Sequence, residues 1–242
     1  MANPIFGNVL EKAERAEGDV MTLSGTLIKS LLLAAGVILS AAYVWALTTA
    51  GYTDKANMLG VIGGISAFIA GLIAVLVRPK ITPILSFIYA IGEGCCLGML
   101  SAVFESYAHG IVVKAVFCTL VTLGVMLALY SMRIIRCTDK FRATVITATA
   151  SILLIYIIQL VATLFSRSIP VIFTASTGGI VFSLFVIAVA ASNFIIDFDS
   201  IERGCNSMVP KIYEWVSALG LMFTLVWLYI EFLHLFMKLQ NR

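Results

Sequence analysis

The sequence is poor in charged side chains. Of its 242 residues only 12% are Asp, Glu, Lys or Arg, whereas 61% are hydrophobic, and the mean hydropathy is +1.04. Soluble domains have about 25% charged and about 45–50% apolar residues. This composition excludes a soluble globular domain and predicts a polytopic membrane protein. The net charge of +3 is small and scattered along the chain, so we expect no nucleic-acid partner.

The sequence also lacks the signatures of enzymes. It has no HExxH zinc helix, no GxSxG nucleophile elbow, no GxxxxGK[ST] phosphate loop and no GxGD sequence of intramembrane aspartyl proteases. No lysine lies near the centre of the last apolar run, which excludes a retinal-type Schiff base. The five cysteines show no paired metal-ligand spacing, and the two histidines lie far apart. We therefore expect a protein that is not an enzyme and has no resident cofactor.

The first 26 residues contain no apolar run. They carry Lys12, Arg15 and four acidic side chains. A secretory signal would have a basic start followed at once by an apolar core. We therefore expect no cleaved leader, and interpret residues 1–26 as a cytoplasmic N-terminal segment.

Seven apolar runs follow, each close to the roughly 20 residues that a membrane-spanning helix needs. They cover residues 27–49, 56–77, 81–104, 111–132, 143–165, 171–196 and 215–237. The connectors are too short for a second domain. The sequence therefore predicts an all-α protein in which residues 27–242 form one bundle of seven transmembrane helices, surrounded by the lipid bilayer.

Lysine and arginine are distributed unequally between the two ends of these helices. Eleven are expected on the side of the N-terminus, and five on the opposite side: Lys12, Arg15, Lys29, Arg78, Lys80, Arg133, Arg136, Lys140, Arg142, Arg203 and Lys211 against Lys55, Lys114, Arg167, Lys238 and Arg242. Cytoplasmic loops carry the excess of basic residues. The distribution predicts a cytoplasmic N-terminus and an outer C-terminus. Lys29 and Lys114 are close enough to helix ends for their ammonium groups to reach the interface.

Small residues recur every four positions in the second and third runs. Small-xxx-small faces most often mark close helix contacts in membranes, so we expect a tight bundle. The residues concerned are Gly60, Gly63, Gly64, Ala67 and Gly71 in the second run, and Gly94 and Gly98 in the third.

Carboxylates inside apolar runs are the candidate functional residues, because a charged group in hydrocarbon is costly and usually marks an ion or proton pathway. Glu93 lies near the middle of the third run and Glu231 beyond the midpoint of the seventh. Asp197 ends the sixth run, and Asp199 and Glu202 follow in the expected polar loop. Each is either a proton or cation ligand, or a hydrogen-bonded or solvated acid without a role in transport.

Four segments carry a resemblance to a known family. They are Asn3-Pro4-Ile5-Phe6, PILSFIYAIGEGCCLGMLSAVFE in the third run, DFDSIERG after the sixth, and EWVSALGLMFTLVWLYIEFLHLF in the seventh. The chain resembles the transmembrane Bax inhibitor motif (TMBIM) family, also called Bax inhibitor/YccA-like, and in particular its bacterial branch. The resemblance covers nearly the whole chain.

The resemblance implies a proton-sensitive calcium leak in the bacterial inner membrane. In that family an acid at the end of the sixth helix and another in the seventh share a proton, and an arginine of the second helix can latch the pair closed. The matching residues are Asp197, Glu231 and Arg78. Deprotonation of such a pair creates a hard-oxygen site for calcium, so the resemblance also implies calcium as the ion at Asp197 and Glu231. The alternative is a non-conducting regulatory protein that binds and modulates a membrane protease.

The spacing of the two acids departs from the family pattern. Asp197 and Glu231 are 34 residues apart (231 minus 197). A hairpin folded near residues 204–207 would place Asp197 level with Glu214, about 25 Å from Glu231 at 1.5 Å rise per residue. Direct contact of the pair would need a broken helix, so we prefer two separate acid layers. They are Asp197, Asp199, Glu202 and Glu214 at the cytoplasmic mouth, and Glu93 and Glu231 deeper in the membrane.

Overall fold

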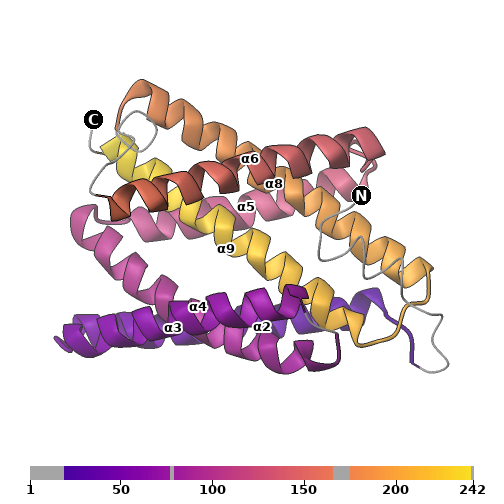
Figure 1. Ribbon diagram of the computed structural model, residues 1–242, viewed down its shortest axis with the longest axis horizontal. Coiled ribbons are helices and arrows are strands. Elements are labelled where there is room, and N and C mark those ends of the chain that lie inside the picture. The colour runs from indigo at the N-terminus through magenta and orange to yellow at the C-terminus, as the bar shows by residue number, and fades with distance from the viewer. Residues whose placement is uncertain (1–18, 77–78, 166–174, 241–242) are drawn as a thin grey trace. The chain divides into compact units, whose positions relative to one another are not determined.

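The computed structural model describes residues 19–76, 79–165 and 175–240, and helices make up the regular structure of this part of the chain. Figure 1 shows the helices in order of colour along the chain. They are α2 (Leu23–Thr49), α3 (Thr53–Leu76), the short 3₁₀ helix η1 (Pro79–Ile81), α4 (Thr82–Tyr107), α5 (Ile111–Ser131), α6 (Asp139–Leu164), α8 (Thr177–Asn206) and α9 (Tyr213–Gln240).

Seven of these helices are long and apolar enough to cross a membrane, which confirms the predicted fold class and implies contact with a lipid bilayer. Large apolar side chains such as Phe68, Ile84 and Phe117 are exposed along the helices, as lipid-facing positions require. The division at residue 26 into a tail and a bundle stays a prediction.

The sixth helix extends further than predicted. The apolar pattern ended at residue 196, but α8 continues to Asn206, so Asp199 and Glu202 lie in the helix rather than in a loop. At about 1.5 Å per residue its 30 residues span about 45 Å, longer than the hydrocarbon core of about 30 Å. Residues 197–206 contain no proline, the residue that most strongly breaks a helix. The turn comes later, where Met208 adopts a positive φ of 51° before Pro210.

The contacts divide the chain into two compact units. The first unit contains α2, α3, η1, α4, the part of α8 from Asp199 and the part of α9 up to Phe223. The second contains α5, α6, and the remaining parts of α8 and α9.

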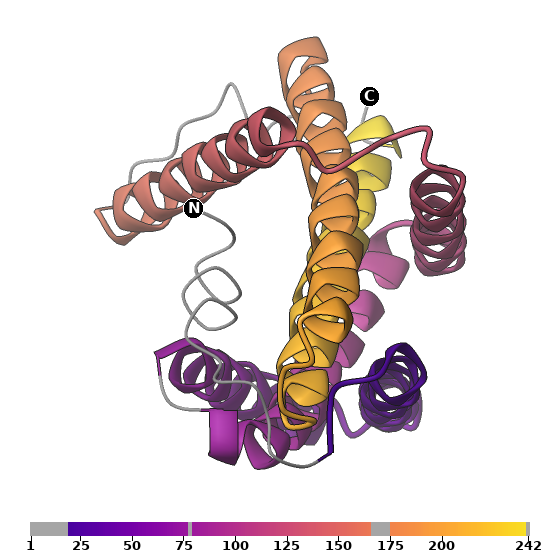
Figure 2. The same cartoon turned by 90° about the vertical axis from the view of Figure 1, so that its right-hand side faces the viewer.

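In the first unit α4 packs along both α2 and α3, and Figure 2 shows these helices close to end-on. Glycines make this possible on two faces of α4. A Cβ atom at Gly63 of α3 would lie 2.6 Å from the carbonyl oxygen of Gly92, and one at Gly98 would lie 2.5 Å from that of Ala41 in α2. The small residues of these runs therefore form helix contacts, as predicted.

Replacing Gly98 with alanine is expected to destabilise the protein by about 1–3 kcal/mol, because the added methyl overlaps backbone and forces α2 away from α4. Gly124→Ala is the matched control, since a Cβ atom there meets nothing within 4 Å. Unfolding of the two variants in mixed detergent micelles would measure the difference. Equal stability of Gly98→Ala and Gly124→Ala would contradict the close contact.

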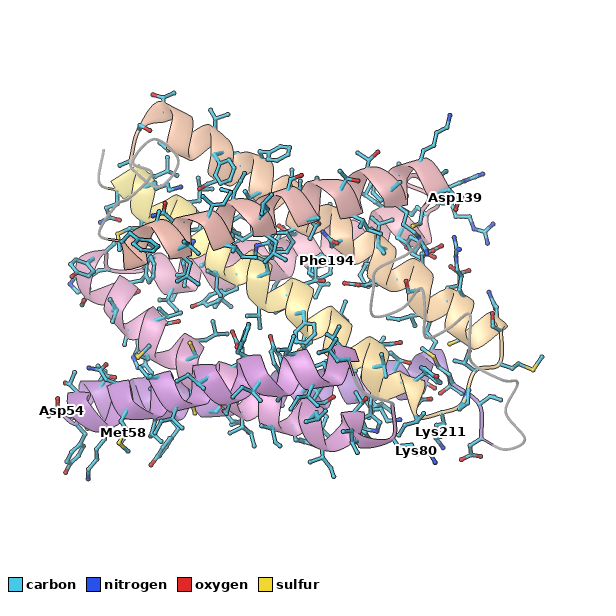
Figure 3. All side chains as sticks on the ribbon, viewed as in Figure 1. Asp54, Met58, Lys80, Asp139, Phe194 and Lys211 are labelled. Carbon is cyan, nitrogen blue, oxygen red and sulfur yellow. The ribbon has the colours of Figure 1, made fainter. Side chains whose placement is uncertain are left out.

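Charged residues at the two ends of the first unit can be compared with the grouping that the sequence predicts. Figure 3 shows Asp54, in the first turn of α3, at the opposite end of this unit from Lys80 and Lys211. The charge pattern of the sequence assigned Lys80 and Lys211 to one membrane face and Lys55, the neighbour of Asp54, to the other. The arrangement within the unit agrees with that grouping, and the orientation in the membrane stays a prediction.

The second unit has a core built mainly on α8. Phe194, labelled in Figure 3, is fully buried and its ring stacks on Phe198 at 6.1 Å between centroids. Ile152 of α6 packs against Val186 of α8 in a separate apolar cluster. These contacts place one apolar face of α8 against α6.

Candidate functional site

Asp197 is a buried acid with a hydroxyl partner on the next helix. It lies on α8 with 3% of its surface exposed. The hydroxyl of Thr224 on α9 donates a hydrogen bond of 2.6 Å to its Oδ2 atom. One turn earlier on α8, the Asn193 amide donates to the hydroxyl of Thr149 on α6 at 2.9 Å. Asp197 therefore belongs to a polar contact region among three helices of the second unit.

Glu231 is the second buried acid of this unit, with 2% of its surface exposed. The phenol of Tyr156, on α6, donates a hydrogen bond of 2.6 Å to its Oε1 atom. A tyrosine hydroxyl buried among apolar side chains usually has a partner, and here the partner is the carboxyl group. Each acid thus has a hydroxyl donor of its own.

Two hydrogen bonds fix the register between α8 and α9. Asp197 meets Thr224, and Ser183 accepts from the Lys238 ammonium at 2.8 Å. The two helices are antiparallel, so residues that face each other lie equally far in sequence from the centre of the hairpin. Both pairs place that centre between Pro210 and Lys211. The same register brings the fully buried Ala190 opposite Glu231. No acid of α8 therefore faces Glu231.

This register corrects the predicted hairpin. The fold was expected near residues 204–207, which would have set Asp197 level with Glu214. Because α8 continues to Asn206, Asp197 instead meets Thr224, ten residues further along α9. Thr224 and Glu231 are seven residues apart, about 10 Å along the helix axis. Glu231 therefore lies about two helical turns further along α9 than Thr224, the residue that Asp197 of α8 contacts.

Glu214 lies in the first unit, where three donors surround its carboxylate. It is fully buried at the start of α9. The backbone N–H and the hydroxyl of Thr22 each donate to its Oε1 atom at 2.9 Å, and the Lys29 ammonium forms a salt bridge with Oε2. The sequence suggested that Lys29 extends towards the membrane interface. The structure shows it paired with Glu214 in the first turn of α9.

The surroundings of Glu214 leave little space for another ligand. A Cβ atom at Gly25 would overlap the carboxylate itself. The Lys29 ammonium also lies 5.3 Å from the centre of the Trp215 ring, and that ring packs on Phe87. The hydroxyl of Thr22 caps α2 by accepting from the N–H of Gly25. Glu214 therefore joins the N-termini of α2 and α9 in the described structure.

The segment before α2 is attached to the α8–α9 connector. Val20 and Pro210 form an antiparallel bridge, and the N–H of Met21 donates to the Val209 carbonyl at 2.8 Å. Lys211 donates through its ammonium to the carboxylate of Asp19 at 2.9 Å. This hydrogen bond and the attraction of the charges lower the pKa of Asp19 and raise the pKa of Lys211. Both side chains are exposed, so the ion pair itself adds little stability.

The remaining predicted site residues are dispersed. Asp199 forms a salt bridge of 2.8 Å with Arg203 one turn later, and Glu202 is exposed. Glu93 is half-buried on α4 and, among the described residues, takes part in no hydrogen bond or ion pair. Arg78, the predicted latch, lies outside the described residues. In the part of the chain that the structure describes, no three His, Cys, Asp or Glu side chains are grouped to hold a metal ion.

Sequence reasoning missed the partners of the buried acids. Thr224, Tyr156 and Thr22 supply hydroxyls to the carboxyl groups. One signal was available: Thr224, Glu231 and Lys238 repeat every seven residues in an apolar helix and so share one face. The partners on other helices leave no such trace.

Comparison with known proteins gives one result. A family model described as Bax inhibitor 1 like matches residues 3–241, which is nearly the whole chain. Comparison with curated proteins and with solved structures gives no match. The chain therefore belongs to the Bax inhibitor 1 like family, which confirms the resemblance to the transmembrane Bax inhibitor motif proteins.

Proposed function

We propose that the protein is a pH-sensitive leak for cations, with calcium as the expected ion, and that buried carboxyl groups form its path. The observation that carries this proposal is the presence of two buried acids at different depths of the α8–α9 pair, Asp197 on α8 and Glu231 on α9. Asp197 and Glu231 lie inside membrane-spanning helices, are almost fully buried, and each has a hydroxyl partner.

The chemistry of these positions suits a hard cation. Calcium prefers carboxylate, carbonyl and other oxygen ligands, and acidic residues inside membrane helices commonly mark ion or proton pathways. A buried carboxyl group needs a proton, a cation or a basic side chain. If a proton and a cation compete for the same carboxyl, the flux of the cation rises with pH. Asp197 and Glu231 then act as two successive cation-binding sites rather than as one pair of carboxyl groups that shares a proton.

The location of the protein is part of the proposal. The excess of lysine and arginine at one end of the helices supports a cytoplasmic N-terminus and an outer C-terminus. The resemblance to bacterial members supports the inner membrane of a bacterium. Asp199 and Glu202, near the end of α8, would then lie on the cytoplasmic side of the membrane.

Calcium flux into proteoliposomes tests the proposal. Between about pH 6 and 8 we expect the flux of the wild type to rise with pH, and the Glu231→Gln and Asp197→Asn variants to lose most of it, because neither amide can replace the carboxylate as an anionic ligand. Asp54→Asn is the matched control, since Asp54 is exposed at the start of α3.

Normal folding of all variants without flux at any pH would contradict the leak. The regulatory alternative would then be tested by deleting residues 1–18, which leaves the contacts of Asp19 and Met21 with the α8–α9 connector in place. Loss of binding to a membrane protease on this deletion would support that alternative.

A further inference from the structure

Lys238 places an ammonium group among oxygen atoms of α8. It lies in the last turn of α9 and is half-buried. Its Nζ atom donates to the hydroxyl of Ser183 at 2.8 Å and to the carbonyl oxygen of Gly179 at 3.1 Å. Ser183 is almost fully buried. A hydroxyl and a backbone carbonyl are the kinds of neutral oxygen that also bind alkali and alkaline-earth cations.

This ammonium lies in line with the two buried acids. Thr224, Glu231 and Lys238 are spaced by seven residues. Seven residues of an α-helix make two turns less about 20°, so the three side chains leave α9 on nearly the same face. Thr224 bonds to Asp197, and Lys238 bonds to Ser183, so this face of α9 lies against α8 over this length. A cation that followed this face from Glu231 to the C-terminal end of α9 would pass the Lys238 ammonium.

Helix stabilisation alone does not account for the contact. The C-terminus of a helix attracts a cation, which favours Lys238 at the end of α9, but a helix N-terminus repels one. Gly179 lies in the first turn of α8. The Lys238 ammonium therefore extends from the C-terminal end of α9, where a positive charge is stabilised, to the N-terminal end of α8, where it is not. The oxygen atoms of Ser183 and Gly179 bind it there.

We propose that Lys238 is a tethered cation: its ammonium occupies an oxygen site at the C-terminal end of the path and has to be displaced before a mobile cation can pass to or from Glu231. The inference rests on the proposed leak, and it adds the group that limits the flux. Lysine suits this role because its ammonium is a compact charge on a flexible stem, which can leave and return. A positive charge at this position also repels divalent cations more than monovalent ones.

The test compares calcium flux into proteoliposomes for the wild type, Lys238→Gln and Lys238→Arg, each checked for a normal elution profile and thermal unfolding. We expect Lys238→Gln to raise the flux several-fold and Lys238→Arg to stay near the wild type, because arginine keeps the charge. Lys114→Gln is the matched control, since Lys114 is exposed on α5 and the same charge is removed. The double variant Lys238→Gln/Glu231→Gln should have no flux, because a cation that no longer meets the ammonium still needs the carboxylate of Glu231.

The outcomes separate this inference from the leak itself. A wild-type flux that Glu231→Gln abolishes but Lys238→Gln leaves unchanged or lowers would overturn the tethered cation and keep the leak. A flux that appears only in Lys238→Gln would support a tethered cation that closes the path at rest, and would overturn a leak that conducts in the wild type. The absence of flux from the wild type and from Lys238→Gln would overturn both.

Discussion

Replacing Lys29 with methionine is expected to lower the free energy of unfolding by about 3 kcal/mol, because it leaves the carboxylate of Glu214 fully buried without its salt-bridge partner. The two donors of Thr22 remain, so the loss should lie at the lower end of what an uncompensated buried charge costs. Titration with a denaturing detergent in mixed micelles would measure it.

A double-mutant cycle separates the salt bridge from the packing of its side chains. Glu214→Gln should cost less than Lys29→Met, because the Lys29 side chain is 17% exposed and its ammonium can turn towards solvent. The Lys29→Met/Glu214→Gln variant should be more stable than the sum of the single losses predicts, since no isolated charge is left. Additive losses would show that the two side chains do not interact in the folded protein.

Gly25→Ala tests the same cluster without removing a charge. The added methyl would overlap the carboxylate of Glu214 and push it away from its donors. Gly36→Ala on the same helix is the matched control, because a Cβ atom there would meet only the Cβ of Ala90 at an ordinary 3.5 Å. We expect a loss of stability for the first substitution only.

The number and approximate limits of the helices were predictable because each needs a continuous apolar run. The runs at 111–132 and 27–49 lie within four residues of α5 and α2 at each end. The end of α8 was not predictable in this way. Residues 197–206 are polar enough to suggest a loop, yet a helix that leaves the hydrocarbon core can continue with charged side chains, and Asp199 pairs with Arg203 one turn later.

The partners of the acids depended on tertiary contacts that a single sequence does not contain. Lys29 and Glu214 are separated by 185 residues, and Tyr156 and Glu231 by 75. The sequence placed Glu214 at the cytoplasmic mouth and Glu231 in an apolar run, but it did not show that the first meets a lysine and the second a phenol. The residue of α9 that faces Asp197 depends on where the α8–α9 hairpin turns. The turn comes later than predicted because α8 is longer than its apolar run.

The hydrogen-bond partners of Glu214 differ in kind from those of Asp197 and Glu231. A carboxylate that already holds a lysine and two further donors, as Glu214 does, gains little from a mobile cation. Asp197 and Glu231 have hydroxyl donors, which can also turn their oxygen towards a cation. The contrast favours the second unit for the proposed path and a structural role for Glu214.

Replacing Thr224 with valine is expected to destabilise the protein by about 1–3 kcal/mol, because Asp197 would lose its hydroxyl donor while it stays buried. Valine has nearly the shape of threonine, so packing changes little. Thr224→Ser keeps the hydroxyl and should restore most of the loss. In proteoliposomes Thr224→Val should also reduce calcium flux, and Thr224→Ser should preserve it, if this hydroxyl is one of the oxygens that a cation meets at Asp197.

Thr119→Val provides the matched control for this substitution. Thr119 is also buried, but among the described residues its hydroxyl bonds only to the Ala115 carbonyl of its own helix. That carbonyl already accepts the helical N–H, so removing the hydroxyl leaves no polar group without a partner. Equal effects of Thr119→Val and Thr224→Val on stability and flux would mean that Asp197 does not depend on Thr224. A loss confined to Thr224→Val would identify this hydroxyl as the partner that makes a buried acid at Asp197 tolerable.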